Sequence, residues 1–159
     1  MARSPDLSQA EATREHLRHA RRHLDLARDL LRRQEPDFRA AAAHVEACYL
    51  AALRALTTWH RVPLPEDADV RALGERAAQF ANVLRTFVRR ALAVLPVLRA
   101  VGGKERLGVH DREGVEAGWY TARNLLLAVA GELPAGVREA AEAPPSEGSA
   151  PSGAPSAGR

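Results

Sequence analysis

The sequence predicts an all-α protein, and three observations support this class. Hydrophobic residues make up 46% of the 159 residues but aromatic residues only 4%, so a core must consist mainly of alanine, leucine and valine. Such a composition favours helices over sheets. Apolar residues also recur every three or four positions along the chain, and strand-like runs are nearly absent. We therefore expect an up-and-down bundle of four main helices with a short additional C-terminal helix.

The first helix is expected from about residue 8 to residue 33. Its arginines alternate with acidic residues, which predicts a solvated face stabilised by ion pairs at helical spacing. Its apolar stripe comprises Leu17, Ala20, Leu24, Ala27 and Leu31. Pro36 and Asp37 follow and are expected to form the first turn of the second helix.

The second helix is expected to be central, because it has two apolar sides. The side expected to be buried comprises Phe38, Ala41, Ala42, Val45, Tyr49, Ala52, Leu53 and Leu56. The other side comprises Ala40, Ala43, Ala47, Ala51 and Ala55. These small side chains permit close approach by a second helix or a second subunit. Cys48 lies inside the apolar pattern and is expected to be a buried small hydrophobic residue.

The third helix is expected after Pro63 and Pro65, which stop the second. Carboxylates at 66–69 would lie near the N-terminus of this helix, where negative charge interacts favourably with the helix dipole. The apolar period continues from residue 70 to residue 95, and the sequence leaves open whether the helix is continuous or broken near Ala81. Pro96 should kink or end this helix, and the glycine pair at 102–103 interrupts it.

The last main helix is expected to follow a loop at 104–110, with Asp111 as its cap and Gly131 at its end. Pro134 then precedes a short amphipathic segment at 137–142. The segment beyond it consists mainly of alanine, proline, serine and glycine. It has too few apolar side chains to offset the conformational entropy lost on ordering. The predicted organisation is therefore a disordered N-terminus at 1–7, one helical bundle at 8–142 and a disordered tail at 143–159.

Composition also bears on compartment and cofactors. Uninterrupted apolar runs, such as that at 125–130, are far too short to span a bilayer, so we expect a soluble cytoplasmic protein without a membrane partner. The single cysteine, Cys48, excludes an internal disulfide and a cysteine-based metal cluster within one chain. The sequence contains nothing that resembles a phosphate-binding glycine loop, and we expect no cofactor.

The net charge of +3 and an isoelectric point near 9.7 raise the question of RNA binding. All basic residues except Lys104 are arginines, however, and with abundant alanine, leucine, glycine and proline this is typical of a GC-rich coding bias. Acidic residues are also interleaved with the arginines. We therefore favour a solvated, ion-paired surface, and RNA stays an open alternative as a partner.

Three histidines of the first helix raise the question of a metal site. His16, His19 and His23 are three and four residues apart, so they share one helical face. They lie among arginines, which disfavour a bound dication, and nothing on this helix completes a tetrahedral set. We expect a solvated face and no metal.

Three segments together resemble the HEPN domain family of helical bundles. These are HVEACYLAALRAL at 44–56, RVPLPEDADVRAL at 61–73 and KERLGVHDREGVEAGWYTARNLLLAV at 104–129. The resemblance covers most of residues 8–133, and it consists of patterns of alanine, leucine and turn residues that other up-and-down bundles share. It implies a long first helix, a second helix rich in tyrosine and alanine, a third helix after a proline turn, and a last helix entered through a polar loop.

The resemblance also implies a candidate catalytic pair. Family members with ribonuclease activity carry an arginine and a histidine separated by four to six residues near the start of the last helix, often opposite the same pair of a second subunit. The corresponding residues here are Arg106 and His110, which are separated by only three. The arginine would stabilise the charge of the transition state and the histidine would move the proton of the attacking ribose hydroxyl, without a metal.

Other arginine–histidine pairs do not strengthen this interpretation, because their number is close to that expected by chance. The pairs with an allowed spacing are Arg14 and His19, Arg18 and His23, Arg39 and His44, and Arg54 and His60. None occupies the catalytic position of the family.

Two functional hypotheses follow. The first is a non-catalytic interaction module that forms a homodimer and serves as partner to another protein, such as a nucleotidyltransferase, as many family members do. The alternative is a metal-independent endoribonuclease that uses Arg106 and His110. A helical bundle unrelated to the family would have the same secondary structure and would predict neither activity nor such a partner.

Overall fold

Helices follow one another along the chain, with one long helix more than the sequence predicts. The computed structural model describes residues 7–142. Its elements are α1 (Leu7–Leu31), α2 (Phe38–Trp59), α3 (Val70–Phe80), α4 (Leu84–Val101), α5 (Val109–Gly131), the short α6 (Ala135–Arg138) and a 3₁₀ turn at Glu139–Ala141. The all-α class is therefore correct. Leu7 already belongs to α1, whereas residues 1–6 and the tail expected at 143–159 lie outside the described residues.

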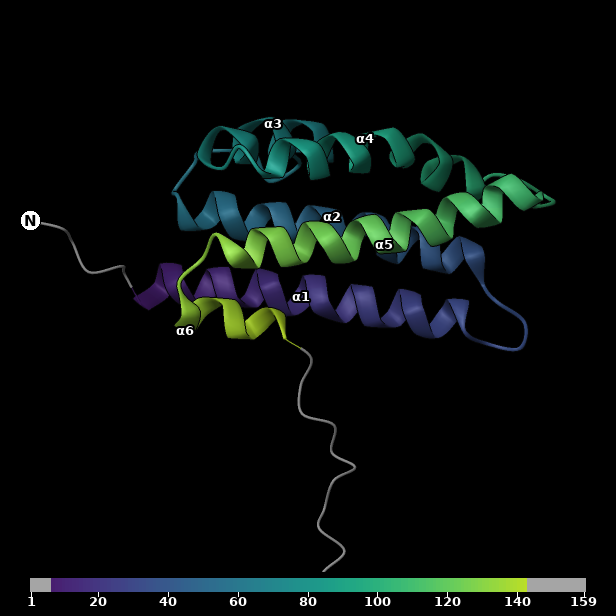
Figure 1. Cartoon of the computed structure of the whole chain (residues 1–159), viewed down its shortest axis with the longest axis horizontal. Coiled ribbons are helices and arrows are strands. Elements are labelled where there is room, and N and C mark those ends of the chain that lie inside the picture. The colour runs from purple at the N-terminus through teal and green to yellow at the C-terminus, as the bar shows by residue number, and fades with distance from the viewer. Residues whose placement is uncertain (1–6, 143–159) are drawn as a thin grey trace, which may run out of the picture.

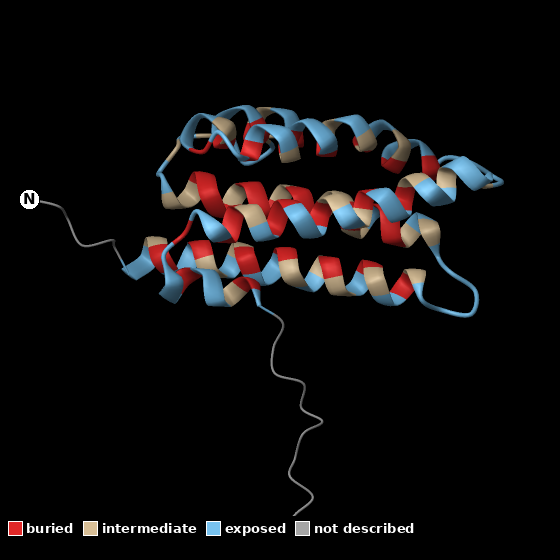
Figure 2. Cartoon of the chain, viewed as in Figure 1, coloured by how far each residue is buried: buried red, intermediate tan, exposed pale blue. Residues whose placement is uncertain are grey.

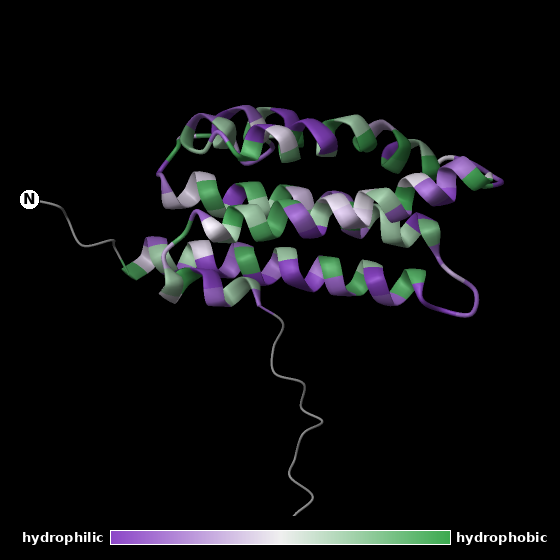
Figure 3. Ribbon diagram, in the orientation of Figure 1, coloured by the Kyte–Doolittle hydropathy of each residue, from purple (hydrophilic) through white to green (hydrophobic). Residues whose placement is uncertain are grey.

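The helices form three layers (Figure 1). α3 and α4 make one outer layer, α2 and α5 the middle, and α1 with α6 the other outer layer. α1 and α2 pack in opposite directions, because Gln9 near the start of α1 hydrogen-bonds to the carbonyl of Trp59 at the end of α2. Buried residues, in red in Figure 2, recur along the helices where the layers meet. Hydrophilic residues recur along α1 (Figure 3), as its arginines and acids predict.

Aspartates define the starts of α2 and α3. The Asp37 carboxylate accepts a hydrogen bond from the Ala40 N–H at 3.0 Å, and Asp69 does the same for Ala72 at 2.9 Å. Both residues are N-caps, which satisfy backbone donors that the first turn of a helix leaves without a partner. Asp37 therefore lies just outside α2 rather than in its first turn.

The start of α5 differs from the expected one. The helix begins at Val109, so His110 lies in its first turn and not in the preceding loop. Asp111 is the third helical residue, and its carboxylate accepts a hydrogen bond from the Gly108 N–H at 2.9 Å. This is the backward-reaching half of a capping box, which places the cap three residues before the aspartate.

The expected third helix is divided at 81–83. Ala81 has extended backbone angles (φ −145°, ψ 110°), and the chain reverses before α4. The reversal places α3 against α4 with Gly74 opposite Val88: a Cβ on Gly74 would lie 2.5 Å from Val88 Cγ1. The apolar spacing of three and four persists across the break, because both helices bury one side. The break near Ala81, which the sequence leaves open, is therefore present.

Pro96 does not end α4, which continues to Val101. A proline within a helix removes one backbone hydrogen bond. Pro96 lies on the exposed side of α4, where water can replace the lost partner. The glycine pair at 102–103 ends the helix as expected.

The core is built from small and branched aliphatic residues around α2. Tyr49 is the largest fully buried side chain, and its hydroxyl donates a hydrogen bond to the Gly118 carbonyl of α5 at 2.9 Å. Cys48 is fully buried, as expected. Ala51 and Ala55 lie on the side expected to permit close approach by a second helix or a second subunit, and both are buried by the chain itself. A second subunit therefore cannot use the whole of this alanine side.

No helix within residues 7–142 combines the length and the apolar character that crossing a bilayer requires.

Candidate functional site

Arg106 and His110 are both surface residues at the junction of α4 and α5. Arg106 is exposed in the connecting loop, and the His110 side chain is fully exposed on the first turn of α5. The His110 Nδ1 atom lies 3.9 Å from a Glu113 carboxylate oxygen. Neither residue lines any of the three grooves described below. The structure thus places the pair outside these hollows, where a bound substrate would stay open to water.

Other charged residues hold this loop in place. The Arg39 guanidinium donates hydrogen bonds to the carbonyls of Lys104 and Glu105. The Lys104 ammonium lies 2.6 Å from the Asp111 carboxylate. This contact, together with the Gly108 N–H, lowers the pKa of Asp111. Arg39 and Lys104 therefore serve the local structure of the loop.

The histidines of α1 do not converge on one point. His19 contacts Glu15 at 3.0 Å, whereas His23 turns toward α2 and its Nδ1 atom lies 2.9 Å from Nδ1 of His44. Within the described part of the chain, no group of three or more histidine, cysteine or acidic side chains could hold a metal ion. The His23–His44 pair was not predicted, because it depends on the register between two helices.

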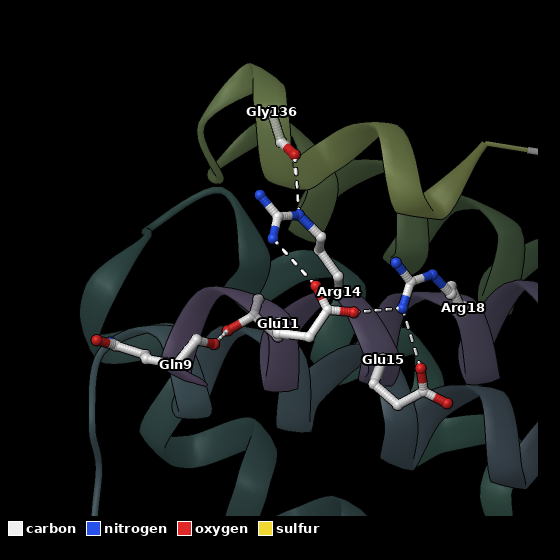
Figure 4. Close-up of polar contacts among 7 residues, drawn as sticks. Gln9, Glu11, Arg14, Glu15, Arg18 and Gly136 are labelled. Atoms are coloured by element: carbon white, nitrogen blue, oxygen red, sulfur yellow. Dashed lines mark hydrogen bonds and ion pairs between the residues drawn. The ribbon is translucent and has the colours of Figure 1, made fainter. Parts of the chain in front are cut away.

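Four of the five arginines of α1 are paired with carboxylates, as the sequence predicts, whereas the exposed Arg22 forms no ion pair within residues 7–142. Figure 4 shows Glu11 between two of them: Arg14 lies 3.2 Å and Arg18 2.9 Å from its carboxylate oxygens. Arg18 also contacts Glu15 at 3.0 Å, and Arg14 donates a hydrogen bond to the Gly136 carbonyl of α6 at 3.1 Å. The hydrogen bond from Arg18 is the largest cause of a lowered pKa at Glu11.

The arginines of α3 and α4 are not paired in this way. α4 contains no acidic residue, and α3 contains only Glu75. Among residues 7–142, ion pairs to a carboxylate are absent for Arg71, Arg76, Arg85, Arg89 and Arg90. Arg99 alone of the α3 and α4 arginines pairs, with Glu46 at 2.9 Å. The outer layer made by α3 and α4 therefore carries five arginines without a carboxylate partner in the described part of the chain, and only one acidic residue.

A groove of about 410 Å³ lies between α4 and α5. The residues that line this α4–α5 groove are Val83, Phe87, Asn124, Leu127, Ala128, Gly131 and Glu132. Val83 is 54% exposed and Leu127 57% exposed, so two large apolar side chains face solvent in the same groove. Nearby, Phe80 stacks on His60 with ring centroids 4.1 Å apart. The groove is mainly apolar and open to solvent.

The sequence itself indicates that a leucine of α5 is exposed. Successive residues of a helix are about 100° apart, so the three leucines at 125–127 cover too wide an arc for one buried stripe. Leu125 and Leu126 are buried, and Leu127 is the one that faces outward. Val83 gave no such sign, because its exposure depends on the chain reversal before α4.

Two further grooves were found. One, of about 630 Å³, lies between α3 and α4. The other, of about 280 Å³, lies between α1 and α5, where Arg28, Arg32 and Glu116 surround Trp119 and Tyr120. The Trp119 indole N–H donates a hydrogen bond to the Leu24 carbonyl at 2.9 Å. Trp119 therefore serves to attach α5 to α1.

Comparison with known proteins gave no match among family models, curated proteins or solved structures.

Proposed function

We propose that this chain is a non-catalytic interaction module that forms a homodimer through its α4–α5 groove. The observation that carries the proposal is the exposure of Val83 and Leu127 beside Phe87 on two adjacent helices. Contiguous apolar surface of this kind is favourable to cover, since each apolar side chain removed from water contributes about 1 kcal/mol or more. A second copy of the chain is the partner that we propose.

Charge at the two ends of the groove supports a two-fold arrangement. α4 and α5 are antiparallel, because a Cβ on Gly114 would touch Val97 and one on Gly118 would touch Val94. Glu132 therefore lies at the Val83 end of the groove, whereas Arg90, one turn beyond Phe87, lies toward the other end. A two-fold axis through the groove brings opposite ends together, so Glu132 of each copy faces Arg90 of the other.

The oligomeric state tests this proposal. We expect wild-type chain to sediment with the mass of two chains of 17.2 kDa, and Val83→Asp and Leu127→Asp to sediment as monomers with unchanged helical circular dichroism. The matched control is Val109→Asp, because Val109 is also an exposed valine, at 68%, but lies far from the groove. A monomeric wild-type chain, or dimers that all three variants leave intact, would overturn the proposal.

Charge exchange gives a second arm of the same test. Glu132→Arg should weaken the dimer, and adding Arg90→Glu to it should restore association, because the pair is then reversed and not removed. Restoration would place these two residues opposite each other across the interface. Failure of the double variant to recover would argue against the two-fold arrangement.

The proposal includes an HEPN-like bundle with a nucleotidyltransferase as partner, and this part rests on the resemblance of the three quoted segments.

An assay for cleavage of a structured RNA in the presence of a chelator distinguishes the interaction module from the endoribonuclease alternative. The interaction module predicts no cleavage by wild-type chain or by His110→Ala. Cleavage that disappears in His110→Ala would instead assign the catalytic role to His110.

A further inference from the structure

The largest of the three grooves lies on the outer layer, between α3 and α4. Its floor is made of buried and half-buried small and aliphatic residues, which are Gly74, Ala78, Val88 and Leu92, and the exposed Ala93 also lines the groove. Because Gly74 has no side chain, α3 can lie directly on Val88, and the floor is low between the two helices. This α3–α4 groove has a volume of about 630 Å³.

Arginines form the rims of the α3–α4 groove. Arg71 comes from α3, and Arg85 and Arg89 come from α4, one turn apart. All three are exposed, and in the described part of the chain none forms an ion pair. Glu75 is the only carboxylate that lines the groove. This contrasts with α1, where Glu11 and other acids pair with four of the five arginines, so the two outer layers differ in electrostatic character.

An apolar floor with cationic rims selects one kind of occupant. We propose that the α3–α4 groove binds an acidic amphipathic helix of another protein, with small apolar side chains on the floor and carboxylates against Arg71, Arg85 and Arg89. The recessed floor suits side chains that enter between two helices, and small residues such as Ala78 and Ala93 let a third helix approach closely. The inference names a partner class for the proposed interaction module, and it uses a surface other than the dimer interface.

Nucleic acid fits the same charge less well. No aromatic side chain lines this groove, so bases would have no stacking surface there. The apolar floor of the groove would also lie against a highly polar ligand. A lipid surface is disfavoured because the apolar residues are recessed: Val88 is buried and Leu92 is half-buried, so neither can insert into a bilayer.

The groove also sets the size and strength of the contact. From Arg71 to Ala78, α3 contributes about two helical turns, or about 10 Å. Such a short contact depends strongly on its charge pairs, and we expect binding in the micromolar range that weakens as salt is added.

The test uses the full chain and two labelled synthetic peptides of about fifteen residues, long enough to cover the groove. Both peptides carry the same alanine and leucine face at helical spacing, flanked by glutamates in one and by lysines in the other. Fluorescence anisotropy measures their binding. We expect the glutamate peptide to bind and the lysine peptide not to bind, and Arg85→Glu with Arg89→Glu to weaken the glutamate peptide by about tenfold or more.

Two variants control for net charge and for shape. Arg32→Glu with Arg33→Glu makes the same change of charge at the end of α1, where both arginines are exposed, and should leave binding nearly unchanged. Ala78→Leu fills the floor without changing any charge and should weaken binding as well. Equal loss in both arginine variants would mean that only net charge matters, which would overturn the assignment to the groove.

The remaining outcomes are also decisive. No binding of the glutamate peptide at about 100 μM would overturn the inference. A single-stranded RNA that binds more tightly than the peptide and depends on Arg85 and Arg89 would assign the groove to nucleic acid instead. Failure here is distinguishable from failure of the dimer, because Val83→Asp should abolish dimerisation and still bind the glutamate peptide.

Discussion

His23 and His44 place two imidazoles in contact between α1 and α2. Their Nδ1 atoms are 2.9 Å apart, so one proton can be shared between the rings, whereas protonating both would put two positive charges together. Burial is the main cause of the lowered pKa of His23, and the charges of His44, His19 and Arg22 add to it. At the residue scale, we expect this contact to make the packing of α1 on α2 sensitive to acid.

We expect the free energy of unfolding to fall as the pH is lowered from about 7 to about 5. The pKa values of His16, His23 and His60 are all lowered in the folded chain, chiefly by burial. The unfolded chain therefore takes up protons first, so this contribution is complete above the ordinary pKa of 6.5 and is lost as the pH falls below it. Urea denaturation at a series of pH values measures the effect.

Replacing His23 by glutamine should make this pH dependence shallower, because one of the three contributing groups is removed. The carboxylates do not obscure the result. The pKa of Glu11, lowered mainly by Arg18, and that of Asp111, lowered mainly by Lys104, start from ordinary values of 4.5 and 3.8. Their contributions are lost only at more acidic pH. Stability that stays constant or rises between pH 7 and pH 5 would contradict the prediction.

At the scale of elements, close helix contacts depend on glycines. α4 and α5 approach each other where Gly114 faces Val97 and Gly118 faces Val94 and Leu98. A Cβ on Gly114 would lie 2.5 Å from Val97 Cγ1, which is shorter than a van der Waals contact. Valine in a helix has essentially one χ1 rotamer, so Val97 cannot turn away. The close approach of α4 and α5 therefore requires a glycine at position 114.

Gly114→Ala should destabilise the chain by about 1–3 kcal/mol, because the overlap with Val97 exceeds the gain in helix propensity. Urea denaturation followed by circular dichroism measures this change. Val97→Ala removes the atom that the new Cβ would overlap. Gly114→Ala should therefore cost less stability in the Val97→Ala background than in the wild-type chain. Gly136→Ala is the matched control, since a Cβ there meets nothing within 4 Å, and it should cause no loss. Equal stability of both alanine variants would count against the contact.

At the scale of the whole molecule, α2 is enclosed by the other long helices. It contacts α1, α3, α4 and α5. Cys48 lies on α2, is fully buried, and has a pKa that burial raises to about 12. A thiol in this state is unreactive, because the thiolate is the nucleophile. Access to Cys48 requires the helices around it to separate.

Cys48 should therefore report opening of the bundle. We expect labelling by a thiol reagent without denaturant to be at least about 1,000-fold slower than in urea, as follows if opening costs several kcal/mol. The labelling rate is measured from the absorbance of the released chromophore, by stopped-flow or manual mixing at equal pH. Rapid labelling in the absence of urea would mean that α2 is accessible without opening of the bundle.

Local information in the chain predicted much of this architecture. The all-α class follows from small aliphatic residues at helical spacing, and prolines, glycines and aspartates such as Asp69 predicted several helix ends. The burial of Tyr49 and Cys48 and the ion pairs of α1 were predicted for the same reason. Each depends on residues that are close together in the sequence.

Other features depend on how distant segments meet, and only the tertiary structure decided them. Division of the third helix at Ala81 preserves the apolar spacing, so the reversal leaves no trace in the pattern. The three grooves and the His23–His44 contact arise from the register between helices. Arg106 and His110, chosen by resemblance, line none of these grooves. Helical periodicity records which face of a helix is buried. It does not record which other helix covers that face, because that choice is made by packing between residues far apart in the chain.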